Sequence, residues 1–269
     1  MFRKVFKYDL AAMGKALVLA PAVWALAVAA ALLVRLMDEE FMTALIFPEM
    51  IAGIAVFFCM AAVTVFPFAV LFLCMRRYYN HFYTDEGYLT FTLPVRRETH
   101  LWSKTVAAFL VCLAALFAEG IAGGLFGLLI PNGPQMIREV LTEVAGLATD
   151  PHYLPLVILF CLTLLVTLLG EIVTLEFSVT QGQIAAKKHK ILAALGIWYL
   201  ISFIKRMVSQ GAGLVLLFSL LRYDDVGSEA AARGSMYLYL LLLLMLEVIC
   251  FFVLYFWNLK QMKNKLALA

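Results

Sequence analysis

Long runs of apolar residues, separated by short polar segments, dominate this chain. An apolar run of about 18 residues or more can cross a bilayer as a helix, because each helical residue adds about 1.5 Å. Such runs follow one another along the sequence. The pattern therefore predicts an all-α membrane protein with six transmembrane helices, at about residues 15–34, 49–75, 104–130, 154–182, 191–221 and 236–258.

Two further segments place apolar residues at helical spacing among polar ones. Residues 1–14 predict an amphipathic interfacial helix in the inner headgroup layer, although a plain basic flank of the first span has the same composition. After the third span, a Pro-Asn-Gly turn and an Asp-Pro pair bracket a second such stretch, which predicts a short amphipathic helix on the outer surface. Its apolar positions are Met136, Ile137, Val140, Leu141 and Val144.

The distribution of charge predicts the topology. Of the 21 Lys and Arg residues, most fall in four segments: the N-terminal stretch, the segment before the third span, residues 187–190 and the C-terminal stretch. Acidic residues gather in the alternate loops. Basic loops stay on the cytoplasmic side, so we expect a multi-pass protein with both termini in the cytoplasm. At 64% hydrophobic and 14% charged residues, the composition excludes an ordinary soluble domain, which has about 25% charged residues.

Motifs for catalysis are missing from the sequence. It has no G-x-x-x-x-G-K-[ST] for nucleotide phosphates, no H-E-x-x-H and no G-x-S-x-G. The four histidines and five cysteines have no metal-ligand spacing. We therefore expect no catalytic residue, no metal site and no cofactor in this chain, and no binding of nucleic acid.

One long polar interruption, residues 82–104, separates the second and third spans. Asp85-Glu86-Gly87 is a turn signal. An apolar patch follows and ends at Pro94, before the basic pair Arg96-Arg97. An apolar patch on a cytoplasmic loop is typical of a surface that contacts a partner, although a helix lying on the bilayer would also use it. We expect a docking surface made by Tyr88, Leu89, Leu93, Pro94 and Arg96.

This segment resembles the loop between spans two and three of type-2 ABC transporter permeases. The matching residues are Gly87-Tyr88-Leu89, Thr92-Leu93-Pro94 and Ser103-Lys104. Supporting similarities are Gly182-Gln183 followed by the basic run 187–190, and a basic tail with Asn264-Lys265-Leu266. With six spans and the N-terminal amphipathic stretch, the resemblance covers essentially the whole chain.

The resemblance implies a permease subunit of an ATP-driven exporter in a bacterial cell membrane. Loop 76–103 would hold a coupling helix, and its part 82–103 would dock on a separate ATPase subunit. Two copies of that ATPase would bind the ATP and Mg²⁺, and a second copy of this chain or a paralogous permease would complete the complex.

Six charged residues fall inside the predicted spans, where each is costly unless it is paired or faces water. Counting about 1.5 Å per residue, Glu119 lies at the same depth as Lys205 or Arg206, and Glu247 is within reach of a long basic side chain. Glu171 and Glu176 fall toward the inner leaflet, where a snorkelling lysine from 187–190 could meet them. The charges form interhelical ion pairs or line a polar pathway; they are Glu119, Glu171, Glu176, Lys205, Arg206 and Glu247.

Three alternatives remain open, one for the fifth span and two for the function. The fifth span could break near Lys205, with 207–221 as a re-entrant segment, because Ser209-Gln210-Gly211-Ala212-Gly213 suits a break and the resembling permeases often carry a re-entrant hairpin. The chain could also be an ion- or proton-coupled transporter that uses Glu119 and Glu247, or a non-transporting sensor or immunity subunit.

Overall fold

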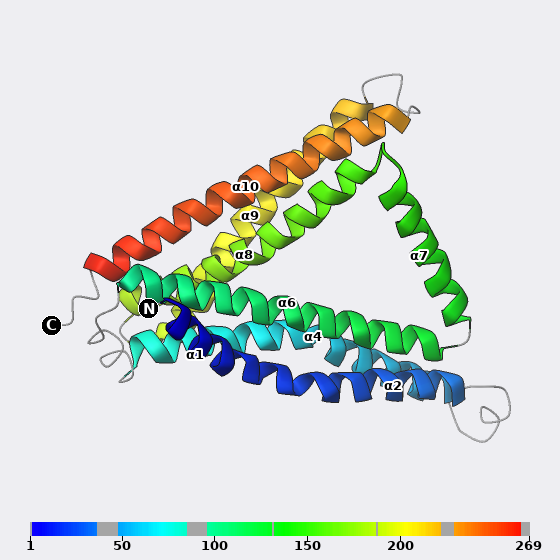
Figure 1. Ribbon diagram of the computed structural model, residues 1–269, viewed down its shortest axis with the longest axis horizontal. Helices are drawn as coiled ribbons and strands as arrows, with labels where there is room; N and C mark the ends of the chain where they lie inside the picture. The colour runs from blue at the N-terminus through cyan, green and yellow to red at the C-terminus, as the bar shows by residue number, and fades with distance from the viewer. Residues whose placement is uncertain are drawn as a thin grey trace. The chain divides into compact units, whose positions relative to one another are not determined.

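The computed structural model describes residues 2–36, 48–84, 96–130, 132–186, 188–221 and 229–264 (Figure 1). In this part of the chain the regular structure is helical, and six helices are long and apolar enough to cross a membrane. The predicted fold class, an all-α protein with six membrane-spanning helices, is confirmed. The elements are α1 (Phe2–Gly14), a 3₁₀ turn (Lys15–Leu19), α2 (Ala20–Leu36), α4 (Pro48–Tyr83), α6 (Arg97–Leu129), α7 (Gly133–Thr149), α8 (Leu154–Ala185), α9 (Lys190–Leu221) and α10 (Glu229–Asn264).

Several helices differ from the apolar runs that predicted them. Helix α4 continues to Tyr83 and α6 begins at Arg97, so both take up residues of the predicted loop 76–103. Helix α9 is continuous from Lys190 to Leu221, and a break near Lys205 is wrong. An N-terminal helix and a helix between the third and fourth spans are both present, as α1 and α7. Asn132, with φ 59°, turns the chain between α6 and α7.

The chain divides into two compact units. Unit 1 consists of Met1–Phe2, Tyr78–Thr105 and Leu147–Ala269, and unit 2 consists of Arg3–Arg77 and Val106–Gly146. The boundaries fall inside helices: the last turns of α4 and the first turns of α6 belong to unit 1, together with α8, α9 and α10. The two ends of the polar segment 84–96 are therefore part of the same unit as the last three helices.

Small residues pack the helices of unit 2. Ala27, Ala30 and Ala31 of α2 are buried, as are Ala115 and Ala122 of α6. Alanines let membrane helices approach closely, which strengthens their van der Waals contact. The indole Nε1 of Trp24 donates a hydrogen bond to the carbonyl of Ala118 at 2.9 Å, which ties α2 to α6. Large apolar side chains such as Phe57 and Phe117 are exposed, as expected of surfaces that face lipid.

In unit 1, helix α8 packs against α9 and α10. Val173 and Phe177 of α8 form a core cluster with Leu254 of α10. Gly182 allows α8 to approach α9 closely, since a Cβ there would lie 2.7 Å from the backbone nitrogen of Ala194. A second core cluster joins α4, α6 and α10 through Tyr78, Phe82, Leu101 and Met262.

Candidate functional site

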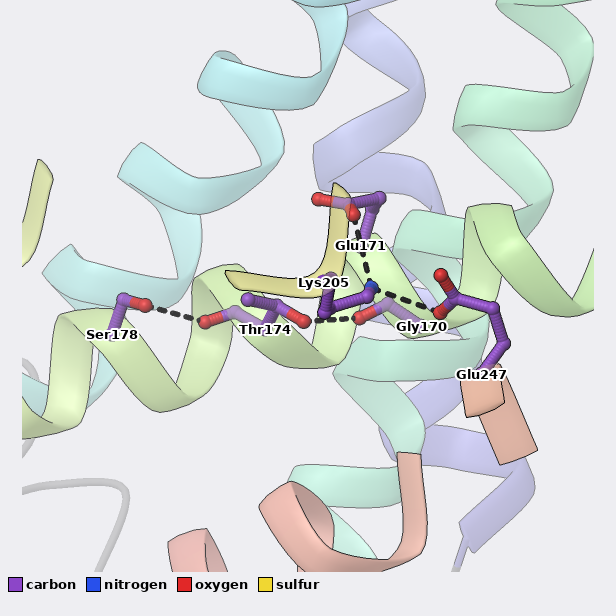
Figure 2. A network of polar contacts seen from close by, with 6 residues as sticks. All are labelled: Gly170, Glu171, Thr174, Ser178, Lys205 and Glu247. Atoms are coloured by element: carbon purple, nitrogen blue, oxygen red, sulfur yellow. Dashed lines mark hydrogen bonds and ion pairs between the residues drawn. The ribbon is translucent and has the colours of Figure 1, made fainter. Parts of the chain in front are cut away.

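An ion triad lies at the packed faces of α8, α9 and α10 in unit 1. The ammonium Nζ of Lys205 on α9 lies 3.0 Å from Oε1 of Glu171 on α8 and 2.8 Å from Oε2 of Glu247 on α10. Figure 2 shows the lysine between the two carboxylates. The side chains of Lys205 and Glu247 are 7% and 10% exposed, whereas that of Glu171 is 31% exposed. Two carboxylates thus share one ammonium, and the more open carboxylate is Glu171.

Helix α8 presents a small polar face beside this triad. The hydroxyl of Thr174 donates to the carbonyl of Gly170 at 2.7 Å, and that of Ser178 donates to the carbonyl of Thr174 at 2.7 Å (Figure 2). These bonds satisfy the hydroxyls without a partner from another helix. Gly170 leaves room for the triad, because a Cβ there would lie 2.6 Å from Oε2 of Glu247.

A second polar cluster lies nearer the end of α8. Glu176 is 1% exposed, and its Oε2 accepts a hydrogen bond from the hydroxyl of Thr105 on α6 at 2.8 Å. Lys104, which is fully buried, is the cation whose charge acts on this carboxylate. The ammonium of Lys104 also lies 5.2 Å from the ring centroid of Phe82 on α4. Three helices therefore meet around one buried carboxylate.

Hydrogen bonds extend this second cluster to α10. The hydroxyl of Tyr83 donates to Oγ1 of Thr180 at 2.7 Å, and the hydroxyl of Tyr78 lies 3.4 Å from the same oxygen. The side-chain amide of Asn258 on α10 donates to the hydroxyl of Tyr78 at 3.3 Å. Buried polar groups are costly unless hydrogen-bonded, so these bonds fix the relative positions of α4, α8 and α10.

The start of α6 is tied to the end of α10. A guanidinium nitrogen of Arg97 donates to the carbonyl of Met262 at 2.7 Å. Next to it, Nζ of Lys263 lies 2.6 Å from Oε1 of Glu98, in an exposed ion pair. We call this end of unit 1, which contains Tyr78–Thr84, Arg96–Thr105 and the adjoining ends of α8, α9 and α10, the basic end.

The predicted site residues are only partly brought together. Tyr88, Leu89, Leu93 and Pro94 lie outside the described residues. Arg96 is exposed, and its carbonyl accepts hydrogen bonds from the first turn of α6.

The embedded charges have partners that differ from those expected. Lysines from 187–190 were expected to meet Glu171 and Glu176. Instead, Lys205 pairs with Glu171. Glu176 accepts a hydrogen bond from Thr105, and the cation whose charge acts on it is Lys104. Glu119 is half-buried and belongs to unit 2, whereas Lys205 belongs to unit 1. The expected pairing of these two residues therefore stays a prediction. Arg206 is exposed.

Comparison with known proteins identifies no relative. No protein-family model matches the chain, and neither a curated protein nor a solved structure matches it.

The small residues of α8 beside the charges were not predicted from the sequence. The signal was the recurrence of Thr163, Gly170, Thr174 and Ser178 at intervals of seven and four residues, which places them on one face of α8. On α10, Glu247, Leu254 and Asn258 share a buried face in the same way. In the described part of the chain, no group of three His, Cys, Asp or Glu residues could hold a metal ion. The arrangement holds one ammonium and two carboxylates between three packed helices.

Replacing Gly170 by alanine is expected to weaken the triad. The new methyl group would displace the carboxylate of Glu247 and break its contact with Lys205, at a cost of about 1–3 kcal/mol. Thermal unfolding of the purified protein measures this cost. Gly196→Ala on α9 is the control, because a Cβ there has open space, and it should be neutral or stabilising by about 0.5–1 kcal/mol. In a Glu247→Ala background the Gly170 penalty should vanish; if it persists, the methyl group acts elsewhere.

Proposed function

We propose that this chain is the permease subunit of an ATP-driven ABC exporter. A separate ATPase docks on the segment 82–103 and supplies the energy. The observation that carries the proposal is the anchoring of both ends of this segment at the basic end. Tyr78 and Tyr83 connect the preceding helix to Thr180 of α8, and Arg97 connects the following helix to Met262 of α10.

This anchoring gives the segment a mechanical role. A force applied between residues 84 and 96 reaches α4 and α6 together, and through the hydrogen bonds it reaches α8 and α10. A packed cluster of this kind transmits displacement, because tightly packed side chains have low compressibility. ATP binding would close two ATPase subunits and move the segment, and the last three helices would respond. This supports the assignment suggested by the sequence resemblance.

Affinity purification tests the proposal. The tagged full chain, extracted from its native membrane in mild detergent, should bring down a protein with a Walker motif in near-equal amount. The complex should hydrolyse ATP, and an ATPase Walker lysine variant in the same complex is the inactive control. A second permease in the complex would indicate a heterodimer. Recovery of the chain alone, without ATP hydrolysis, would contradict the proposal.

The ion triad favours an ion- or proton-coupled transporter as a second candidate. Two carboxylates share one ammonium at the centre of three packed helices, and Glu171 is partly open. Such a carrier would move substrate in ATP-free proteoliposomes under an ion gradient, and Glu171→Gln would abolish that transport. Transport that needs ATP and ignores the gradient would exclude this candidate.

A further inference from the structure

A pocket of about 450 Å³ lies at the basic end of unit 1, where α9 begins. Its polar wall contains Lys188, His189 and Lys190, all of them exposed. Tyr79 of α4 contributes an aromatic side chain with a hydroxyl group. A volume of this size lies within the range of about 300–1,000 Å³ that is typical of sites for small ligands. Two ammonium groups and an imidazole around such a space suit an anion.

The other wall of the pocket is apolar. Ile191, Leu192 and Leu195 line it, and Ile191 and Leu192 are 62% and 69% exposed. Two of these residues begin a longer feature, which we call the α9 ridge: Ile191, Leu195, Tyr199 and Phe203, four residues apart and all exposed. Residues at this spacing lie on one face of a helix. The rings of Tyr199 and Phe203 stack with centroids 6.2 Å apart, so the ridge is continuous at its far end.

We propose that this pocket binds the headgroup of an anionic phospholipid, with the acyl chains lying along the α9 ridge. The phosphate of the lipid contacts Lys188 and Lys190, and Tyr79 takes the interfacial position that tyrosines favour. Basic pockets between helices at the cytoplasmic side of a membrane protein suit such headgroups. This inference stands independently of the exporter proposal, since it rests only on α4, α9 and the two residues before α9.

The continuity of charge and apolar surface selects a lipid over other anions. A soluble phosphate compound would use the basic wall but leave the ridge without a role. A protein that docks at the basic end would have to cover a ridge that runs along a predicted membrane span. Only a molecule with an anionic head and apolar chains matches both parts of the surface.

Lipid retention by the purified full chain tests the proposal. The protein is incubated in detergent with equal amounts of phosphatidylglycerol and phosphatidylcholine of identical acyl chains, and bound lipid is counted by native mass spectrometry. The wild type should retain phosphatidylglycerol preferentially. The Lys188→Gln/Lys190→Gln variant should bind it about twenty-five-fold more weakly, since each basic residue near an anionic headgroup contributes roughly a factor of five. In a second comparison, between phosphatidylglycerols with long and with short acyl chains, the wild type should prefer the long chains. The Leu195→Ser/Tyr199→Ser variant should lose this preference.

The control is Arg76→Gln/Lys260→Gln, which removes two exposed basic residues outside the pocket lining. It should retain phosphatidylglycerol like the wild type. Equal binding of both lipids, an equal loss in the control, or retention by the pocket variant would each overturn the proposal. Displacement of the lipid by millimolar inorganic phosphate would show a site for free anions instead. If the pocket variant kept the lipid but lost a co-purifying ATPase, the surface would be a protein contact.

Discussion

Replacing Lys205 by methionine is expected to destabilise the folded protein by about 3–5 kcal/mol. The substitution keeps most of the side-chain volume but leaves Glu171 and Glu247 facing each other without their shared cation. The loss is costly mainly at Glu247, whose buried carboxylate is then neither solvated nor paired, and in a membrane protein the apolar surroundings add to this. The midpoint of heat-induced unfolding, followed by size-exclusion chromatography in detergent, measures the loss.

Substitutions at a neighbouring cation and at the two carboxylates of the triad are matched controls. Arg206→Met removes a neighbouring cation that is exposed, and it should have little effect. Glu247→Gln leaves Lys205 and Glu171 as a one-to-one pair, so it should cost much less than the lysine substitution. The triple variant with methionine at 205 and glutamine at 171 and 247 should recover most of the lost stability. An equal effect of Lys205→Met and Arg206→Met would show that the triad does not hold the helices together.

Exchange of residues 87–95 for a Gly/Ser linker of equal length is expected to abolish substrate-stimulated ATP hydrolysis and transport. Under the exporter proposal this stretch contains the surface that the ATPase contacts. The exchange spares Arg97 and Glu98, which join α6 to α10, so the permease should still fold. Hydrolysis and transport by the reconstituted complex are the measurements.

A second exchange serves as the control for the linker. Replacing residues 222–228, which the charge distribution places on the opposite side, with a Gly/Ser linker of equal length should leave hydrolysis intact. Size-exclusion profiles establish that both variants are folded. Undiminished transport by the 87–95 variant would contradict the proposal that this segment couples ATP hydrolysis to transport.

The spans could be predicted from the sequence because the bilayer demands long apolar helices, whereas the charge partners could not. Counting 1.5 Å per residue gives each charge a depth but no direction around its helix. Glu171 and Lys205 differ in depth by about 5 Å on this count, a difference that the four-carbon stem of lysine can bridge. The contact of Lys205 with Glu171 as well as Glu247 depends on how α8, α9 and α10 face one another, which only the structure supplies.

The alternative of a break in α9 is excluded for a related reason. Gly211 and Gly213 each weaken a helix by about 1 kcal/mol relative to alanine. Opening the helix in an apolar environment would leave backbone groups without partners, at a cost of several kcal/mol each. The larger effect prevails, and α9 continues to Leu221. Conversely, α6 begins at Arg97, earlier than its apolar run, because Arg97 and Glu98 gain partners on α10.

The triad also bears on how the protein is made. Glu171 is synthesised first and has its cation only when Lys205 follows on the next helix, and Glu247 comes last on α10. A helix with an uncompensated charge enters lipid at a high cost, so α8 is expected to wait beside the insertion machinery until its partners emerge. The three helices would then enter the bilayer as one group, and a ribosome that stalls before α10 would leave behind an intermediate that lacks Glu247.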